Sequence, residues 1–210
     1  MNNSRRIGIL VIILIIIAIA LMLIIPTLNP KYIYTNDNGE SFEFVKSPVG
    51  DLTMHVLTTY VTYKGDISDY QYTIPLRNGP KSLEDISVVK GINPVILNKK
   101  YVYITLNPDR NSQAVLASIE IAKVIGTADY GVFKIPTKGA FTHPVNNTNS
   151  TETPIITCKN ANKDIGVIEL RLGNENKIYS NKECVILEAK DEESLIRVAD
   201  RFVYNLLGVM

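Results

Sequence analysis

Residues 101–135, YVYITLNPDRNSQAVLASIEIAKVIGTADYGVFKI, contain the clearest supersecondary pattern in the chain. The first six residues are β-branched, aromatic or aliphatic and predict a strand, and a second strand is expected at 131–135. Between the two strands, Asn111 or Ser112 can cap a helix, and Gly126 suits the position just after its last turn. The segment therefore predicts a β-α-β unit with parallel strands and a right-handed crossover.

Earlier in the chain, residues 53–63 and 70–76 are two β-rich runs separated by turn-forming residues. They predict an antiparallel hairpin, because alternating apolar and polar residues suit a half-buried strand. Pro75 has no amide hydrogen, so the second arm is expected at a sheet edge. A short strand is predicted before the hairpin at 41–45, and a short helix after it near 82–89.

Later in the chain, three more strands are expected, at 155–158, 166–172 and 184–189. Asp191 can cap a final helix from residue 192 to about 207, whose apolar residues recur at helical spacing. Together these patterns predict an α/β or α+β fold. Its body would be a mixed-sheet domain with a β-α-β unit and a C-terminal helix.

An unbroken apolar run at residues 7–25 precedes this body. As a helix, the run would extend roughly 28 Å, close to the ~30 Å hydrocarbon core of a bilayer. Pro26 would end that helix. We therefore expect an uncleaved transmembrane anchor in contact with the lipid bilayer. The Ala-Ile-Ala sequence at 18–20 leaves a cleaved signal peptide open as the alternative.

Two basic residues, Arg5 and Arg6, lie on the short N-terminal side of the apolar run. The positive-inside rule therefore places the N-terminus in the cytoplasm and the body outside, in a single-pass protein of the cell membrane. The two largest portions of the body, residues 41–144 and 154–210, could share one sheet or form separate subdomains, and the sequence leaves both arrangements open. The expected organisation is a cytoplasmic tail (1–6), a transmembrane anchor (7–25), a juxtamembrane stalk (26–40), a β-rich and β-α-β portion (41–144), a polar Asn/Ser/Thr linker (145–153) and a portion with strands and the C-terminal helix (154–210).

The balance of charge excludes one class of function. The whole chain has 22 Lys and Arg residues against 21 Asp and Glu residues, and only Arg5 and Arg6 precede the body. The body is therefore nearly neutral and has no long basic run. Because nucleic-acid binding depends on clustered Lys and Arg side chains that neutralise phosphates, no nucleic-acid partner is expected. Low net charge and many aliphatic residues also argue against disorder.

Two further features fit an exported body. Cys158 and Cys184 are the chain's two cysteines, and an even number in an exported domain favours one disulfide over two buried thiols. Asn146 and Asn149 begin two N-glycosylation sequons, Asn-Asn-Thr and Asn-Ser-Thr, within the polar linker. A polar loop can also contain sequons by chance. The interpretation that follows is an extracytoplasmic glycoprotein with a disulfide.

Motifs for catalysis, metals or cofactors are incomplete in this sequence. His55 falls within a predicted strand and is expected to be a hydrogen-bonded, partly buried residue, and His143 is expected in a loop. The Asp-Glu-Glu run at 191–193 suits a helix N-terminus better than a cation site. Gly126 and Gly131 have the spacing of a phosphate-binding loop, but the Lys-Ser/Thr pair that should follow is missing. We therefore expect no cofactor and no metal, and no enzymatic motif is recognisable.

The chain has eleven tyrosines and no tryptophan. Tyrosine alternating with threonine on a sheet face can form a polar, aromatic contact surface, and ordinary cross-strand packing is the alternative. Six of the tyrosines fall on predicted strands: Tyr60, Tyr63, Tyr70, Tyr72, Tyr101 and Tyr103.

The leading functional interpretation is a membrane-anchored, extracytoplasmic binding, scaffold or cell-surface assembly component. It would act through contacts with a membrane or cell-surface protein. One alternative is a membrane-tethered extracytoplasmic hydrolase, which a pocket with converging carboxylates of perturbed pKa would favour. The other is an exported ligand-binding subunit of a membrane complex.

Overall fold

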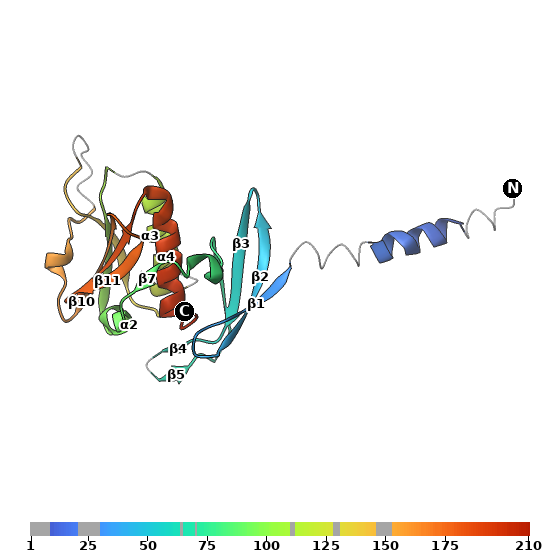
Figure 1. The fold of residues 1–210 in the computed structure, drawn as a ribbon, viewed down its shortest axis with the longest axis horizontal. Helices are drawn as coiled ribbons and strands as arrows, with labels where there is room; N and C mark the ends of the chain where they lie inside the picture. The colour runs from blue at the N-terminus through green and yellow to red at the C-terminus, as the bar shows by residue number, and fades with distance from the viewer. Residues whose placement is uncertain are drawn as a thin grey trace.

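The computed structural model describes residues 9–20, 30–63, 65–69, 71–109, 112–127, 131–145 and 153–210. The body is a mixed α/β fold with two main sheets. Figure 1 shows these sheets on opposite sides of a layer that contains the two long helices of the body.

The larger sheet has six strands and contains the parallel part of the fold. Its spatial order is β7 (Ser87–Val88), β11 (Lys177–Asn181), β12 (Cys184–Ala189), β10 (Ile165–Leu172), β8 (Tyr101–Leu106) and β9 (Thr137–Phe141). Strands β12, β10, β8 and β9 are parallel to one another, whereas β11 pairs antiparallel with β12 and parallel with β7. Since β8 pairs directly with β10, strands from the portions before and after the polar linker share one sheet.

The smaller sheet is antiparallel throughout. Its order is β1 (Lys31–Thr35), β2 (Ser41–Val49), β3 (Leu52–Thr59) and β6 (Tyr72–Leu76). A two-stranded ribbon of β4 (Thr62–Tyr63) and β5 (Asp66–Ile67) extends from the β3–β6 connection. Strand β6, which contains Pro75, is at one edge, as the missing amide hydrogen predicted.

The helices of the body are α3 (Ser112–Ile125), α4 (Glu192–Leu206) and the shorter α2 (Ile92–Leu97), with 3-10 turns η1 (Pro80–Leu83) and η2 (Cys158–Asn160). Asp191 caps α4 by accepting a hydrogen bond from the Ser194 amide at 2.8 Å, which confirms the predicted start of the final helix. Pro94 lies in the first turn of α2, where a helix leaves backbone N–H groups without intrahelical partners, so the proline is tolerated.

The helical layer joins the two sheets through one continuous apolar core. The Phe44 ring on β2 meets the Tyr204 ring on α4 edge to face, with 5.8 Å between centroids. On the opposite side, buried residues of the large sheet such as Ile168 and Leu187 belong to the same core. A polar contact reinforces the junction, because Lys123 of α3 donates to the Pro75 carbonyl at 2.6 Å. The small sheet is therefore an integral layer of the fold.

The predicted β-α-β unit is present, but its second strand was placed too early. Strand β9 begins at Thr137, whereas residues 131–135 are not a strand. The amides of Val132 and Phe133 instead donate to the Val124 carbonyl, and the Ile135 amide donates to the Ile125 carbonyl. These apolar residues fold back onto the end of α3 and satisfy carbonyls that the helix leaves unpaired.

Two other predicted elements differ from the structure. In the segment 155–158, only Ile155 forms a bridge, to Phe141, and the chain then turns into η2, where Thr157 and Asn160 form a capping box. The predicted helix at 82–89 is replaced by η1 and the short strand β7. In both places short-range hydrogen bonds and pairing with distant strands outweigh the local propensity.

Part of the segment 26–40, predicted as a juxtamembrane stalk, belongs to the fold. Residues 31–35, inside the predicted stalk 26–40, form β1. Its tyrosines alternate toward the core, and the Tyr32 ring stacks on Phe44 with 5.2 Å between centroids. This aromatic contact explains why an otherwise polar segment joins the sheet.

Residues 9–20 form a helix whose large apolar side chains are all 47–64% exposed. Within the described residues, no helix combines the length and the apolar character that crossing a membrane requires. Arg5, Arg6 and Pro26, from which the orientation and the end of the anchor were predicted, lie outside the described residues. The sequon residues Asn146 and Asn149 lie outside them as well.

Candidate functional site

A polar cavity of about 580 Å³ opens where the turn after β1 meets the C-terminal half of α4. Polar side chains from four separate segments line it: Tyr34, Asp37, Glu84, Asn93, Arg201 and Asn205. The volume falls within the ~300–1,000 Å³ of small-molecule pockets, which are usually more apolar than this one. The lining therefore favours a ligand rich in polar or charged groups.

The turn between β1 and β2 holds one wall of the cavity in place. The Asn36 side-chain carbonyl accepts hydrogen bonds from the amides of Asn38 and Glu40, at 3.0 and 2.9 Å. The Asn36 amide group donates to the Gly208 carbonyl at 3.3 Å. Gly208 follows α4 with a φ of 75°, a backbone conformation that favours glycine. One asparagine thus orders the turn and joins it to the end of α4.

A reciprocal amide pair holds the floor of the cavity. The Asn93 side-chain amide of α2 donates to the Asn205 backbone carbonyl at 2.9 Å, and the Asn205 side-chain amide donates to the Asn93 side-chain oxygen. Both residues are partly buried. Each of these two lining residues therefore orients the other.

Arg201 is the least satisfied charged group on this wall. Its Nε and Nη1 atoms are buried and have no hydrogen-bond partner among the described residues. Burial lowers the pKa of Arg201, and the nearby Tyr34 and Asp37 only partly oppose that shift. The side chain as a whole is only partly buried, so these two nitrogens face the protein interior while another part of Arg201 lines the cavity.

Acidic groups stand opposite this cation. Asp37 and Glu84 are both exposed and line the cavity. The Tyr34 hydroxyl is hydrogen-bonded to Glu84, and burial followed by the charge of Glu84 raises the pKa of Tyr34. The cavity thus presents one cation, two carboxylates and several amides. This arrangement can bind charged groups of both signs, but it contains no activated nucleophile.

His55 lines a separate cavity of about 370 Å³, with Tyr32, Lys46 and Lys81 among its neighbours. Its Nδ1 atom lies 2.7 Å from the Tyr32 hydroxyl, and burial lowers its pKa. Burial also raises the pKa of Tyr32 to about 12. A Cβ on Gly79 would lie 2.7 Å from His55 Nδ1, so the glycine makes room for this packing. His55 is therefore a partly buried, hydrogen-bonded strand residue, as expected.

His143 comes closest to a catalytic arrangement. Its Nε2 atom lies 3.0 Å from an Asp109 carboxylate oxygen, and its Nδ1 atom lies 3.0 Å from the Thr142 hydroxyl. The order of acid, imidazole and hydroxyl resembles a nucleophile–base–acid relay. However, the side chains of His143 and Asp109 are 44% and 71% exposed. Water would compete with each contact of this relay.

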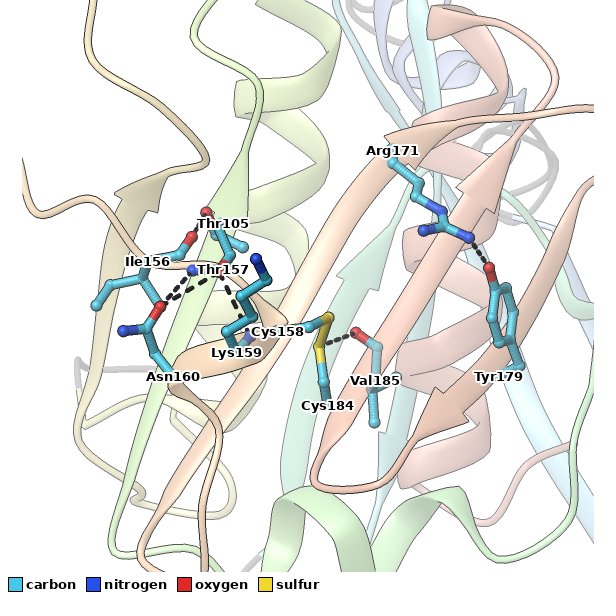
Figure 2. The surroundings of a disulfide bond; sticks show 10 residues. All are labelled: Thr105, Ile156, Thr157, Cys158, Lys159, Asn160, Arg171, Tyr179, Cys184 and Val185. Atoms are coloured by element: carbon cyan, nitrogen blue, oxygen red, sulfur yellow. Dashed lines mark hydrogen bonds between the residues drawn. A yellow bond between two sulfur atoms is a disulfide. The ribbon is translucent and has the colours of Figure 1, made fainter.

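Cys158 and Cys184 form the predicted disulfide. Figure 2 shows how the bond ties the segment around η2 to β12 across one face of the large sheet. A small second core of Val167, Cys184 and Ile186 lies beneath that segment. Glu169 is close enough for its carboxylate and the two sulfurs to form a metal-binding group geometrically. The sulfurs are joined in the disulfide and are not thiolates, the form that binds metals.

The remaining predicted candidates lie apart from the Arg201 cavity. The 191–193 acidic run supplies the cap and first turn of α4, as its position predicted. Tyr101 and Tyr103 contact each other on β8, with 4.9 Å between their ring centroids. Tyr72, on β6 of the other sheet, instead donates a hydrogen bond from its hydroxyl to the Val132 carbonyl. The described tyrosines therefore do not gather into one aromatic surface.

No sequence pattern predicted this cavity. Its lining residues come from four places in the chain, which no local spacing brings together: 34–38, Glu84, Asn93 and 201–210. The only local signal was the polar turn after Tyr34, with three Asn or Asp residues in succession. Arg201 occupies an ordinary polar position of an amphipathic helix.

No family model, no curated protein and no solved structure matches this chain.

Proposed function

We propose that this chain is a membrane-anchored, extracytoplasmic binding domain that holds a small polar ligand in the Arg201 cavity. The observation that carries the proposal is a polar cavity whose lining brings Arg201 together with the carboxylates of Asp37 and Glu84. Polar and charged side chains that converge on one cavity can fix the orientation of a small polar ligand.

The proposed anchor rests on residues 7–25. The run carries no charge, and Arg5 and Arg6 precede it, which favours a cytoplasmic N-terminus. The part that the structure describes is helical, with apolar side chains exposed on every face, and lipid would cover such a surface. The disulfide between Cys158 and Cys184 fits an oxidising, extracytoplasmic location for the body.

A protein-contact role is the second candidate, and the outer face of the small sheet favours it. Ile33, Val49 and Leu52 are 70%, 58% and 48% exposed on β1, β2 and β3. Register places half-buried Val45 opposite Val56 on the same strands. This face is polar in part, since Lys31 and Glu43 form an exposed ion pair on it. It would suit a protein partner in the same membrane.

The proposed topology is tested by adding protease to intact cells that display the full chain. The body should be digested while the anchor remains with the membrane. Full protection of the body would contradict the extracytoplasmic location.

The proposed ligand site is tested by retention of a small molecule. Wild type, Arg201→Gln and Arg197→Gln are purified as full chains, equilibrated with a small-molecule extract of the producing cells and washed. Bound compounds are then released by denaturation and identified by mass spectrometry. Arg197 is the matched control because it is on the same helix and pairs with Asp85 at 2.8 Å outside the cavity. We expect a compound retained by wild type and by Arg197→Gln but lost from Arg201→Gln. Equal retention by all three chains, or none by wild type, would overturn the proposal.

A further inference from the structure

One end of the small sheet lies beside the point where the chain enters the body. The Lys46 amide on β2 donates to the Pro30 carbonyl at 3.0 Å, and Pro30 directly precedes β1. Because β1 and β2 are antiparallel, β2 continues past the start of β1 to its turn with β3. Figure 1 shows the β2–β3 hairpin reaching beyond β1. The hairpin tip (residues 49–52) and the entry of the chain therefore share one end of the sheet.

The proposed anchor ends only a short distance before this end of the sheet. The apolar run stops at residue 25, and Pro26 and Pro30 are four positions apart. An extended chain covers at most ~3.3–3.6 Å per residue, so this link spans no more than about 14 Å. The polar layer on each side of the hydrocarbon core is roughly 5–8 Å thick. An anchor that crosses the bilayer therefore holds this end of the sheet within reach of the lipid headgroups.

The hairpin tip is apolar on its outer face. Val49 and Leu52 form the last pair of the hairpin and are 58% and 48% exposed. Gly50 has a φ of 60°, which suits the turn between them, and the exposed Asp51 can remain in the polar layer of a membrane. Aliphatic side chains at a protruding tip are stabilised when they enter the boundary between headgroups and acyl chains.

The opposite face of the same hairpin is basic. Lys46 and His55 pair with each other three positions before Val49 and Leu52, so their side chains point to the other face. With Lys81 they line the cavity of about 370 Å³, called the lysine cavity below. Its described lining residues include two exposed lysines and no acidic residue. Burial, and then the charge of Lys46, lowers the pKa of His55, so the two lysines supply the positive charge.

The acidic residues that follow Lys81 in the chain have partners elsewhere. Asp85 pairs with Arg197 at 2.8 Å. Glu84 is hydrogen-bonded to Tyr34 and lines the Arg201 cavity. Neither acid lines the lysine cavity, which therefore suits an anionic group.

We propose that this end of the small sheet docks on the membrane that holds the anchor. Val49 and Leu52 enter the acyl boundary, and Lys46 and Lys81 bind the phosphate of an anionic phospholipid. The two levels are three strand residues apart, or about 10 Å at ~3.3 Å per residue. That separation matches the ~5–10 Å to which apolar side chains enter the boundary below the headgroups. The inference rests on the anchor of the proposed function and does not involve the Arg201 cavity.

A bilayer is the occupant that serves both faces of the hairpin end. It offers an apolar layer to the tip and phosphate groups to the lysines, and the tether keeps it close to both. Free phosphate would satisfy the lysines and leave Val49 and Leu52 in water. A protein partner on the outer face, the second candidate above, would cover the tip without occupying the lysine cavity.

The test uses tryptophan as a reporter, because the chain contains none. Leu52→Trp places one at the hairpin tip. Ile67→Trp is the matched control, since Ile67 is 67% exposed on β5, in the ribbon that Figure 1 shows at the other end of the small sheet. Each full chain is reconstituted into vesicles of phosphatidylcholine and phosphatidylglycerol. Emission is then compared with and without bromine on the lipid acyl chains, which quenches only tryptophan that contacts them.

We expect bromolipid to quench and blue-shift Leu52→Trp and to leave Ile67→Trp unchanged. In the Leu52→Trp chain, Lys46→Gln combined with Lys81→Gln should lower the ratio of docked to undocked body about 30-fold, since each lysine near an anionic surface contributes about 5-fold. Lys100→Gln combined with Lys159→Gln changes the net charge equally, at exposed residues outside the small sheet, and should have no effect. Circular dichroism establishes that each variant is folded.

Other outcomes would overturn the inference. These are a Leu52→Trp signal that stays in water, a blue shift without quenching, which would indicate a protein partner, and equal quenching in the two double-lysine variants. Loss of quenching on addition of inorganic phosphate at constant ionic strength would mean that the cavity takes the free anion. Flotation separates this inference from the anchor: a chain that does not float with the vesicles refutes both, whereas a floating chain with its tip in water refutes the docking alone.

Discussion

The carboxylate of Asp200 on α4 accepts two hydrogen bonds from Asn78, one from its backbone amide at 2.9 Å and one from its side-chain amide at 2.8 Å. Asn78 follows β6, so this contact joins the helical layer to the small sheet. Tyr204 strengthens it by donating to the Asn78 carbonyl at 2.9 Å. The other oxygen of Asp200 is buried without a hydrogen-bond partner in the described part of the chain.

This buried carboxyl makes stability depend on pH. Burial, and secondarily the charge of Glu120, raises the pKa of Asp200 to about 7 in the folded protein. The pKa is near 3.9 in an unfolded chain, so the folded state binds this proton more tightly. Protonation of Asp200 therefore stabilises the folded state fully below about pH 4, and this stabilisation is lost as the pH rises to 7. The corresponding loss in the free energy of unfolding is about 4 kcal/mol.

We expect the free energy of unfolding contributed by this group to fall between pH 4 and pH 7, measured by urea denaturation at several pH values. Asp200→Asn keeps an oxygen acceptor for Asn78 and should flatten that dependence. Asp164→Asn changes an exposed carboxylate, 56% accessible, and should leave the profile as in wild type. An unchanged profile in Asp200→Asn would contradict the assignment.

The close approach of the Glu188 side chain to Gly173 gives the second prediction. A Cβ on Gly173 would lie 2.2 Å from the Glu188 carboxyl carbon, so the glycine leaves space for that side chain. Glu188 cannot move freely, because Arg171, Lys177 and Tyr179 all hold its carboxylate. Gly173→Ala should therefore destabilise the fold by about 1–3 kcal/mol in denaturant unfolding.

Gly139 provides the matched control for this substitution. It lies in β9, and an added Cβ would have no neighbouring atom within 4 Å among the described residues, so Gly139→Ala should be neutral or slightly stabilising. Equal destabilisation by both alanines would mean that Glu188 is not the cause.

Arg171 and Arg201 differ in their hydrogen-bond partners, and this difference gives the third prediction. Arg171 donates to the Glu188 carboxylate from Nε at 3.2 Å and Nη2 at 3.0 Å, whereas Arg201 has two buried nitrogens without partners among the described residues. Arg171→Met should lower the free energy of unfolding by about 1–3 kcal/mol, because Glu188 loses partners. Arg201→Met should leave it unchanged or raise it, since a costly buried charge is removed. If Arg201→Met lowers the free energy of unfolding as much as Arg171→Met does, Arg201 has a structural role.

The disulfide gives the fourth prediction. Cys158 and Cys184 are separated by 26 positions, and a crosslink over that span stabilises by about 3–4 kcal/mol in the chain-entropy description. Replacing both cysteines by alanine, or adding a reductant, should lower the thermal midpoint, measured by circular dichroism. If reductant lowers the midpoint of the alanine variant as much as that of wild type, the effect does not come from the disulfide.

Local patterns in the sequence were sufficient for much of the large sheet. Strand β12 matches its predicted bounds, β8 and α3 follow from apolar spacing, and α4 begins after the predicted Asp191 cap. The disulfide could be predicted because the chain has one possible pair. These features depend on residues close in sequence or on simple counting.

The features that could not be predicted depend on distant partners. Strand β11 includes the polar residues Lys177, Ser180 and Asn181 and is stabilised by its pairing with β12. Strand β1 is stabilised by the stacking of Tyr32 on Phe44. The Arg201 cavity needs β1, α2 and α4 to meet, which requires the complete three-layer packing. Local sequence propensity does not indicate which distant segments come into contact.

The most direct test of the ligand site observes the Arg201 guanidinium itself. In a ¹H–¹⁵N spectrum of the full chain in detergent micelles, the side-chain Nε–H signal of Arg201 is identified by its absence from Arg201→Gln. Because this group is buried, its hydrogen should exchange slowly with water. We predict that the compound retained by wild type shifts this signal, because Arg201 lines the cavity in which the compound would lie. A signal that stays in place while the compound is retained would contradict the central claim that the Arg201 cavity is the ligand site.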